Sequence, residues 1–548
     1  MHFFDDINTT SLLLKMKEIF VNHSLNGKKI DERIRFIGSC NPLRRNKNNE
    51  YKEGLQFENN KEEEMVYFVN PLPNSMLNYI FYFKNLDNED IKNYIENIIS
   101  DEFPKGEKED SENSILRKIA IDTIYNSHKF IEKKNGISSV SLRDFQRFKK
   151  TYRFFNEYYK NKNEFLMNIG EKIFDKIEKK TKIQSLVMSL FINYYIKIFK
   201  YAYKHLYLQE INYSITKLSK KFKIKEWLDN IYLMYDPFYY IIKEEEDFLL
   251  EQMEIKKEKG ICLNNSLREN ILLMFFSIYS QIPLIVVGKP GSSKSLSIQL
   301  IIRYMRGEYS NSNFLKKYPA INVTYFYESE MNTPESIENI IKEAQKKIDL
   351  IDYNQKVISL LVFDNLDLSE KNPTNCLKGL HSKLEILLEQ EEKKRISFIG
   401  LSNWRLDPVK MNLAAFLAIP DFKLDDIKLN IETMANSYNK GIYNKYSKQY
   451  KLLTKIYFNY KEYLKKDLKD ESYSNFDGER NFYNLIKIFS NEMIKYNMTD
   501  DPYIIDMGVQ KALARNLYNL EINRESILKK YINIDNLKTM DLIKDNIL

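Results

Sequence analysis

The chain has 548 residues, of which 43% are hydrophobic and 29% are charged, so it can bury several domain cores, and global disorder is excluded. Its net charge of +8 comes from basic residues interspersed with acidic ones, which argues against a nucleic-acid-binding protein. The 3 cysteines and 5 histidines lack metal-ligand spacing, which excludes a disulfide framework and a zinc module. A reducing, cytoplasmic environment is expected.

We find no targeting or membrane-spanning pattern. The N-terminus carries acidic residues and lacks the apolar stretch of a signal peptide. Residues 185–208 are apolar but are interrupted by lysines, and residues 271–287 contain Gln281 and Pro283. A membrane helix needs about 20 uninterrupted apolar residues. We therefore expect a buried helix in the first segment, a helix followed by a strand in the second, and no transmembrane segment.

The first half of the chain combines a strand-like start with long helical stretches. An apolar run at the start is followed by Asp5 and Asp6. Residues 44–64 and 101–114 are charged and poor in apolar side chains, which predicts solvated loops. Residues 158–255 are rich in Tyr, Phe and Lys, with the aromatic residues at helical spacing. This spacing indicates a helical segment with an aromatic core rather than a surface that stacks on bases.

A phosphate-binding pattern follows. The β-branched run 282–287 predicts a buried parallel strand, and residues 295–305 have apolar side chains at helical spacing. The connecting loop runs Gly288, Lys289, Pro290, Gly291, Ser292, Ser293, Lys294, Ser295 and Leu296. Strand, glycine-containing loop and helix are the context of a P-loop. We expect this loop to bind ATP, with Lys294 at the β- and γ-phosphates and Ser295 holding Mg²⁺.

Two more apolar strands supply the other parts of such a site. Residues 357–363 lead to Asp364, which is placed as a Walker B acid on Mg²⁺. Residues 396–402 lead to Asn403, in the position of the sensor 1 polar residue, between the two Walker strands. We therefore predict an α/β fold, the parallel sheet of an AAA+ P-loop NTPase, with a helical lid.

Several segments resemble the AAA+ core of the mysterin family of giant AAA+ ubiquitin ligases. They are EKGICLNNSLRENILLMFF (258–276), GKPGSSKSL (288–296), CLKGLHSKLE (376–385), SNWRLDPVKMN (402–412), GERNFYNLIK (478–487) and KALARN (511–516). The family itself has serine before the loop lysine, so Ser293 is a family feature rather than damage. The resemblance places Arg480 on the sensor 2 arginine.

The same resemblance extends to the start of the chain. FFDDINTT resembles the Walker B segment of a preceding AAA+ module, with Asp6 in the place of the usual glutamate. Residues 33–45 and 69–83 resemble its sensor 1 strand, which carries Asn41, and the segment after that strand. Residues 141–155 resemble its sensor 2 helix, with Arg143 in the key place. The chain is thus expected to begin inside one AAA+ module, and neighbouring modules, in the same or a separate chain, are its expected partners. The expected domains are the C-terminal part of that module (1–157), a helical bridge (158–255), an α/β nucleotide domain (256–422) and a helical lid (423–548).

Besides Asp6, the chain departs from the family pattern at two further positions that concern hydrolysis. Asn365 follows Asp364 where most AAA+ proteins have a glutamate that orients the attacking water. An amide cannot take a proton from water, and losing a general base costs roughly 10²- to 10⁴-fold in rate. Asp367 is a candidate substitute, although it lies past the strand end. Leu413 stands where the family motif has an arginine that could act on a neighbouring module's nucleotide.

We therefore expect Asp364, Asn365, Asn403 and Arg480 to surround a bound Mg-ATP that is hydrolysed weakly. One alternative is an active AAA+ ATPase motor segment of a dynein- or midasin-like protein, against which the match of residues 402–412 argues. The other is a non-catalytic nucleotide-binding scaffold. Ubiquitin ligase activity is implied only for a longer chain. Residues 438–475, rich in Lys and Tyr, are expected to be a surface insert.

Overall fold

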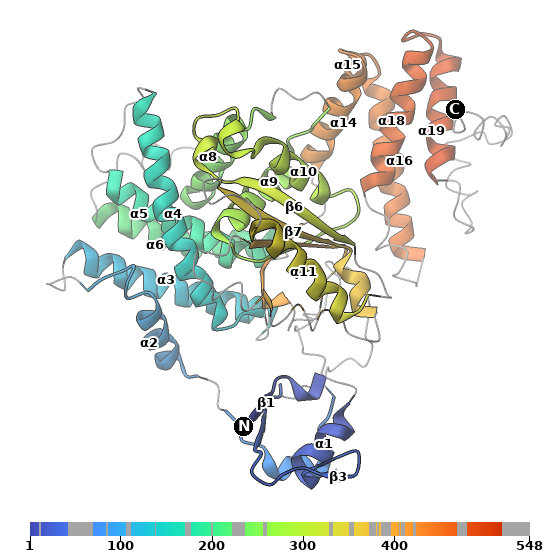
Figure 1. The fold of residues 1–548 in the computed structure, drawn as a ribbon. Coiled ribbons are helices and arrows are strands. Elements are labelled where there is room, and N and C mark those ends of the chain that lie inside the picture. Colours follow the sequence, from blue (N-terminus) through green and yellow to red (C-terminus); the bar gives the residue numbers. More distant parts are fainter. Residues whose placement is uncertain are drawn as a thin grey trace. The chain divides into compact units, whose positions relative to one another are not determined.

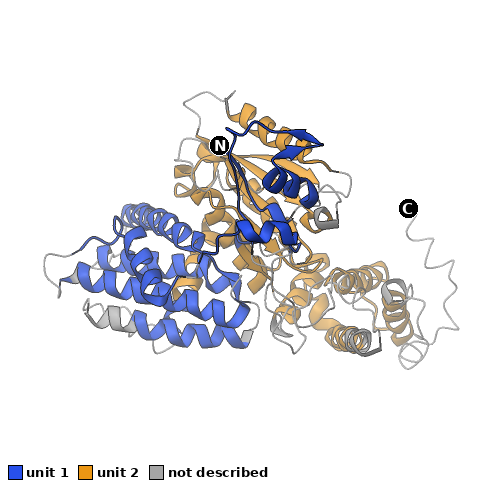
Figure 2. Cartoon of the chain, turned by 90° about the horizontal axis from the view of Figure 1, so that it is seen from below, with its two compact units in different colours: residues 1–52, 58–238, 406–415 blue, residues 53–57, 239–405, 416–548 orange. Residues whose placement is uncertain are grey.

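The computed structural model describes the chain from residue 1 to residue 517 with gaps. The described residues are 1–9, 12–41, 70–83, 86–105, 111–136, 139–169, 177–198, 201–221, 236–255, 260–327, 332–349, 356–371, 377, 380, 383–384, 396–404, 406, 411–419, 424–467 and 479–517. They form two compact units (Figure 2). The first unit contains the described residues up to 238 and those of 406–415. The second unit contains all the other described residues. The boundaries expected at 157, 255 and 422 stay predictions.

The first unit begins with a small α/β piece. Its strands β1 (His2–Phe4) and β4 (Phe36–Gly38) pair in parallel. The ring centroids of Phe4, Phe20 and Phe36 lie 5.9–6.2 Å apart and pack one face of this pair. The remaining elements are η1 (Ile7–Thr9), α1 (Leu13–Asn22), β2 (Ser24–Leu25), β3 (Lys28–Lys29) and η2 (Asn74–Tyr79). The two parallel strands end side by side, which is the arrangement expected of neighbouring Walker B and sensor 1 strands.

The rest of the first unit is helical (Figure 1). Its elements are α2 (Asn88–Ile98), α3 (Glu112–Asn135), α4 (Arg143–Asn168), α5 (Ile177–Asn193), η4 (Tyr195–Lys197) and α6 (Tyr201–Lys221). Asp87 and Ser111 cap α2 and α3 by accepting backbone N–H bonds, which satisfies groups that a helix start leaves unpaired. Helix α4 packs on α5, and α3 packs on α6. Tyr159, Tyr194 and Tyr207 are buried between them, so the aromatic residues form a core as expected.

Residues 185–208 do not form the single buried helix that the sequence suggested. Helix α5 ends at Asn193, and the chain makes the short turn η4 before α6 begins. The segment is buried through Ile198, so only the burial of its first part is as expected. The break falls where Lys197 turns inward to Asp144, 2.7 Å from Nζ to Oδ1. No helix in the described part of the chain has the length and apolarity needed to cross a membrane.

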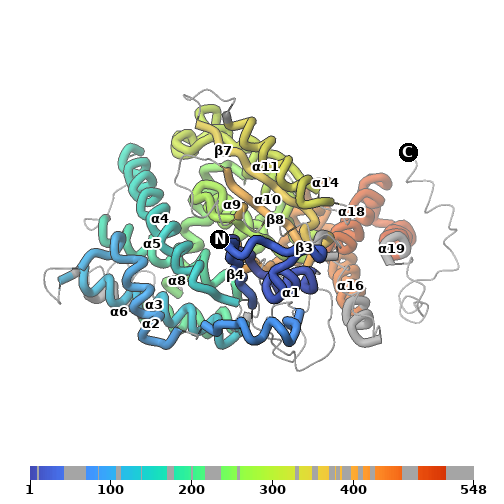
Figure 3. Tube along the Cα trace, turned by 60° about the horizontal axis from the view of Figure 1, so that its bottom comes forward, coloured from blue at the N-terminus to red at the C-terminus, as the bar shows by residue number. Residues whose placement is uncertain are grey.

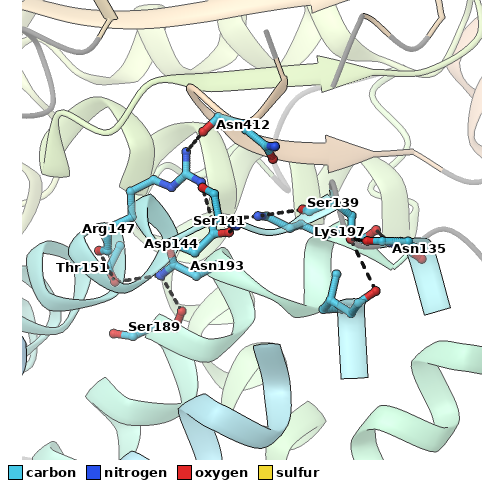
Figure 4. A network of polar contacts seen from close by, with 12 residues as sticks. Asn135, Ser139, Ser141, Asp144, Arg147, Thr151, Ser189, Asn193, Lys197 and Asn412 are labelled. Carbon is cyan, nitrogen blue, oxygen red and sulfur yellow. Dashed lines mark hydrogen bonds and ion pairs between the residues drawn. The ribbon is translucent and has the colours of Figure 1, made fainter. Parts of the chain in front are cut away.

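A cluster of buried charges joins the helices of the first unit (Figure 4). The Asp144 carboxylate accepts hydrogen bonds from Lys197 Nζ at 2.7 Å, from Arg147, and from the Ser141 N–H at 2.9 Å. Burial alone would raise the pKa of Asp144, but Lys197 and Arg147 hold it well below its usual value. Arg147 Nη1 also donates to the carbonyl of Asn412 at 3.0 Å.

The bond to Asn412 explains why residues 406–415 cluster with the first unit, although the sequence placed them within the nucleotide domain. Asn412 and Leu413 are buried there, as is Met411. A buried backbone carbonyl needs a donor, and the Arg147 guanidinium supplies one. The sequence could not reveal this pairing because the two residues are far apart along the chain.

The second unit contains a five-stranded sheet in the order β6-β7-β8-β5-β9. Its strands are β5 (Leu284–Val287), β6 (Ala320–Tyr327), β7 (Val357–Asp364), β8 (Ile396–Ser402) and β9 (Ala415–Ala418). The pairs β6–β7, β7–β8 and β8–β5 are parallel. Strand β8 lies between β7 and β5, where the sensor 1 strand was expected. The predicted fold class, an α/β AAA+ P-loop fold with helical parts, is confirmed.

Helices cover this sheet (Figures 1 and 3). They are α9 (Asn265–Ser280), α10 (Lys294–Tyr304) and α11 (Pro334–Asp349). Helix α8 (Pro237–Gln252) is joined to α9 by ion pairs of Arg268. The unit also contains the short helices η6 (Gly307–Tyr309), η7 (Leu315–Lys317) and η8 (Leu366–Lys371). Helix α9 packs on β8, α10 on β6, and α11 on β6 and β7. The segment 271–287 is a helix followed by a strand, as expected.

A separate helical layer completes the second unit. It comprises α14 (Leu424–Tyr438), α15 (Ile442–Lys445), α16 (Ser447–Asp467), α18 (Glu479–Lys495) and α19 (Pro502–Leu517). Its core includes Tyr446, Tyr450 and Leu453, and the Tyr450 hydroxyl lies 2.8 Å from Ser490 Oγ. The prediction that residues 438–475 are a surface insert is therefore wrong for their first part. Their tyrosines recur at helical spacing and face inward while the lysines face out.

We predict that Asp144→Ala destabilises the first unit by about 3–5 kcal/mol, because Arg147 and Lys197 would remain buried without their counter-charge. Hydrogen exchange of α3–α5 peptides measures the effect as lost protection. Asp122→Ala is the matched control, since its pair with Lys92 is exposed and contributes about 0–1 kcal/mol. Equal protection in the two variants would contradict the prediction.

Candidate functional site

The loop expected to bind ATP, Gly288–Leu296, runs from the end of β5 into the first turn of α10. Gly291 has a φ of +93°, and a Cβ there would lie 2.7 Å from the backbone nitrogen of Arg480. At Gly288 a Cβ would lie 2.7 Å from Ser292 Oγ. Gly291 is favoured by its left-handed backbone and by the close approach of Arg480. Gly288 is favoured only by the close approach of neighbouring atoms.

Ser293 is the residue that replaces the usual last glycine of the loop. It has a φ of 64°, in the left-handed region, and directly precedes α10. Left-handed backbone costs a non-glycine residue about 1–2 kcal/mol, so the surrounding fold imposes this conformation. The loop therefore keeps at Ser293 a backbone geometry that glycine adopts more easily.

Lys294 places a buried ammonium at the centre of the site. Its Nζ donates to the carbonyl of Gly288, to that of Lys289 at 3.2 Å, and to Asn403 Oδ1 at 3.2 Å. Burial lowers the pKa of Lys294 to about 8, against the opposing effects of Asp367, Asp364 and Glu479. A desolvated cation at the start of a helix, held by loop carbonyls, suits an anionic ligand such as a phosphate.

Asp364 is the last residue of strand β7, and Asn365 follows it directly. The Asn365 N–H donates to Asp364 Oδ1 at 2.9 Å, and Asn365 has a φ of 59°. The start of the chain repeats this geometry, since Asp6 has a φ of 49° and its N–H donates to Asp5 Oδ1 at 3.1 Å. The shared conformation supports the expectation that the two segments are equivalent parts of two modules.

Asn403, at the end of β8, stands between opposite charges. Its Oδ1 accepts from Lys294, while its backbone N–H and its Nδ2 donate to Asp367 at 3.2 and 3.4 Å. Only one orientation of the side-chain amide satisfies both neighbours. Asp367 is 2% exposed, and burial raises its pKa.

The structure thus brings Asp367 into the site, whereas the sequence placed it past the strand end. The signal that could have found it is its spacing from Asp364. One turn of the short helix η8 after the strand carries a residue three positions on back to the sheet edge. Asn403 at the neighbouring strand end then offers donors to it.

The lid reaches the loop through the start of α18. Glu479 is the first residue of α18, and the backbone of Arg480 is the closest neighbour of Gly291. Both side chains act on Lys294 electrostatically, Glu479 raising its pKa and Arg480 lowering it. Arg480 therefore lies beside the P-loop region, where a sensor 2 arginine is expected.

The two residues expected to hold Mg²⁺ carry side-chain oxygens, the type of ligand that this ion prefers. Ser295 lies in the first turn of α10, and Asp364 ends β7. No cluster of three or more His, Cys, Asp or Glu side chains suited to a metal occurs among the described residues. Mg²⁺ binds through one or two protein oxygens, substrate phosphates and water, so it does not need such a cluster.

Arg143 and Leu413, which the resemblance also singled out, have surroundings unlike those of the Lys294 site. Arg143 is the first residue of α4, beside the buried Asp144 of the first unit. Leu413 is buried, so its apolar side chain packs in the interior. Most of the segment 376–385, together with Lys410, lies outside the described residues.

The chain is similar to known proteins across both units. The family model of the RNF213 AAA domain matches residues 260–426. The E3 ubiquitin-protein ligases RNF213 of Homo sapiens and Mus musculus are each 28% identical over 76% of this chain. The protein rnf213-beta of Danio rerio, also an E3 ubiquitin-protein ligase, is 27% identical over 76% of it. The chain is therefore mysterin-like in sequence. It spans 8% of the length of each of these relatives.

The match to the RNF213 AAA domain makes the second unit an AAA+ module, a class of domain that binds nucleotides. The matched range 260–426 includes the loop, the ends of β7 and β8, and the first residues of α14. The lid helix α18, which carries Arg480, lies beyond that range and owes its place to the fold. In this mysterin-like chain the candidate site is thus built from the AAA+ sheet and from the helical layer that follows it.

We predict that Gly291→Ala increases hydrogen exchange at the start of α18, because the added Cβ would meet the Arg480 backbone. The control is Gly441→Ala, where φ is +90° but nothing lies within 4 Å. Both changes strain the backbone by about 1–2 kcal/mol, and only the first also creates a collision. Equal exchange at α18 in the two variants would refute the contact.

Proposed function

We propose that the second unit binds Mg-ATP and hydrolyses it slowly, as the nucleotide-responsive part of a mysterin-like assembly. The observation that carries this proposal is the buried Lys294 ammonium, placed between the loop carbonyls and Asn403. Its position lets it neutralise the β- and γ-phosphates. Mg²⁺, when bound by Ser295 and Asp364, supplies charge neutralisation of the phosphates.

Each remaining residue has a role that its position supports. The loop Gly288–Leu296 cradles the phosphates, Asn403 orients a γ-phosphate oxygen or the attacking water, and Arg480 contacts the phosphates from the lid. Asn365 occupies the place of the usual glutamate and cannot accept a proton. Binding is therefore retained while hydrolysis is slowed.

The wider role follows from the family. The relatives are named as ubiquitin ligases, and we propose that this chain contributes AAA+ modules to such an assembly, with neighbouring AAA+ modules as partners. The free thiols of Cys40 and Cys262, the two cysteines among the described residues, agree with a cytoplasmic location. An active motor segment is the second candidate, and the buried carboxylate of Asp367 in the site is the observation in its favour.

Lys294→Ala is expected to weaken Mg-ATP binding by roughly 10- to 100-fold, since a charge-assisted hydrogen bond to phosphate contributes about 1.5–3 kcal/mol. Titration of the 548-residue chain with a fluorescent ATP analogue measures this loss. Lys440→Ala, at an exposed position of the same unit, serves as control and should bind as the wild type does. If the wild type does not bind the nucleotide, the proposed function is wrong.

Asn365→Glu should raise the rate of ATP hydrolysis at least tenfold, because it restores a carboxylate at the end of the Walker B strand, where a general base contributes roughly 10²- to 10⁴-fold. Phosphate release under saturating Mg-ATP measures the rate. A wild-type chain that already turns over as fast as the variant would show that Asn365 does not limit hydrolysis.

A further inference from the structure

We propose that Asp367 supplies the carboxylate that orients and deprotonates the attacking water, the role that Asn365 cannot fill. This inference rests on the proposed Mg-ATP binding and assigns its slow hydrolysis to a particular side chain. Its basis is the position of Asp367, which accepts hydrogen bonds from Asn403, the residue whose Oδ1 accepts from Lys294.

The backbone after β7 is built to return Asp367 to the sheet edge. Asn365 takes a left-handed conformation, and the Leu368 N–H donates to its carbonyl at 3.0 Å, which closes the first turn of η8. Leu366 anchors this turn by packing on Gly400 of β8. A Cβ at Gly400 would lie 2.2 Å from Leu366 Cδ1, so no larger residue fits beneath the turn.

The side chain of Asp367 is then held against Asn403, at the end of β8. It accepts two hydrogen bonds from Asn403, whose Oδ1 accepts from Lys294. Among the charges that act on Lys294, Asp367 has the largest effect, ahead of Asp364. Since Lys294 is expected to lie against the β- and γ-phosphates, the charge of Asp367 acts on the group that would hold those phosphates.

The first unit gives an independent parallel. There Asn41, in the sensor position, donates from Nδ2 to Asp6 Oδ1 at 2.8 Å. Asp6 occupies the position of Asn365 in the second module. In both modules the sensor asparagine is thus bonded to a carboxylate, and in the second module that carboxylate comes from Asp367. The acid has not been lost from the site but comes from a residue two positions later.

In the proposed step, water displaces ADP from the γ-phosphorus of ATP. The oxygen of water attacks the γ-phosphorus, and the bond from that phosphorus to the bridging oxygen breaks with its electron pair leaving on ADP. Asp367 takes the proton from the water and afterwards releases it to solvent. Burial raises the pKa of Asp367, which makes it a stronger base than an exposed aspartate. Its hydrogen bonds to Asn403 oppose this by occupying carboxylate oxygens, which keeps the reaction slow.

The test compares Asp367→Asn with the double variant Asn365→Glu/Asp367→Asn in the 548-residue chain. Affinity for a fluorescent ATP analogue with Mg²⁺ and the release of phosphate from ATP are measured separately. We expect Asp367→Asn to lose at least tenfold in hydrolysis rate, with nucleotide affinity within about threefold of wild type. The double variant should recover hydrolysis, because it returns a carboxylate to the usual position. Asp500→Asn, an exposed site, is the control and should leave both quantities unchanged.

Each other outcome is decisive. If Asp367→Asn binds nucleotide and hydrolyses it at the wild-type rate, Asp367 is not the water-activating group. If both variants are equally slow, Asp367 serves only to hold Asn403, and the inference is wrong. A wild-type chain that binds Mg-ATP but releases no more phosphate than Lys294→Ala also overturns it. Failure of the wild type to bind Mg-ATP would overturn the proposed function itself.

Discussion

The desolvated ammonium of Lys294 is the constraint that organises the AAA+ unit. A buried cation is costly unless acceptors and counter-charges surround it. Loop carbonyls, the amide of Asn403 and nearby carboxylates meet that requirement. These groups come from the ends of separate parallel strands, so the order of the strands, with β8 between β7 and β5, is what brings them together. The same groups that stabilise the lysine also define the volume in which a phosphate can be held.

Close packing at two glycines positions the start of α18 and the turn after β7 against the site. Gly291 lets the start of α18 approach the loop, and Gly400 lets Leu366 seat the turn after β7. Each glycine removes a side chain where two backbone segments must nearly touch. The lid and the turn that carries Asp367 are thus positioned by local steric requirements rather than by surface salt bridges, which contribute little. A change in the loop is therefore felt directly at the N-terminus of α18.

The sequence predicted what depends on local pattern. Apolar runs that end in Asp364 and Asn403 indicated the strands and their order, and the loop motif indicated the strand-to-helix connection. The sequence did not predict the features that depend on residues far apart along the chain. Burial of the tyrosines around Tyr450 needs the facing helix α18, and residues 406–415 cluster with the first unit because Arg147 bonds to Asn412. The place of Asp367 depends on a turn whose geometry is set by packing on Gly400. Propensity and spacing contain none of this information.

The two modules show how one requirement can be met by different residues. An asparagine at the end of a sensor strand has an amide that must donate, and near a strand end that carries acids a carboxylate is the natural acceptor. Asn41 donates to Asp6, and Asn403 donates to Asp367, which lies two positions after Asn365. The backbone is left-handed at Asp6 and at Asn365 alike, so this position has the same backbone conformation whether or not it carries an acid. Under the proposal that Asp367 activates the attacking water, an asparagine at position 365 does not make the module inert, because the turn after β7 returns a carboxylate to the same strand end.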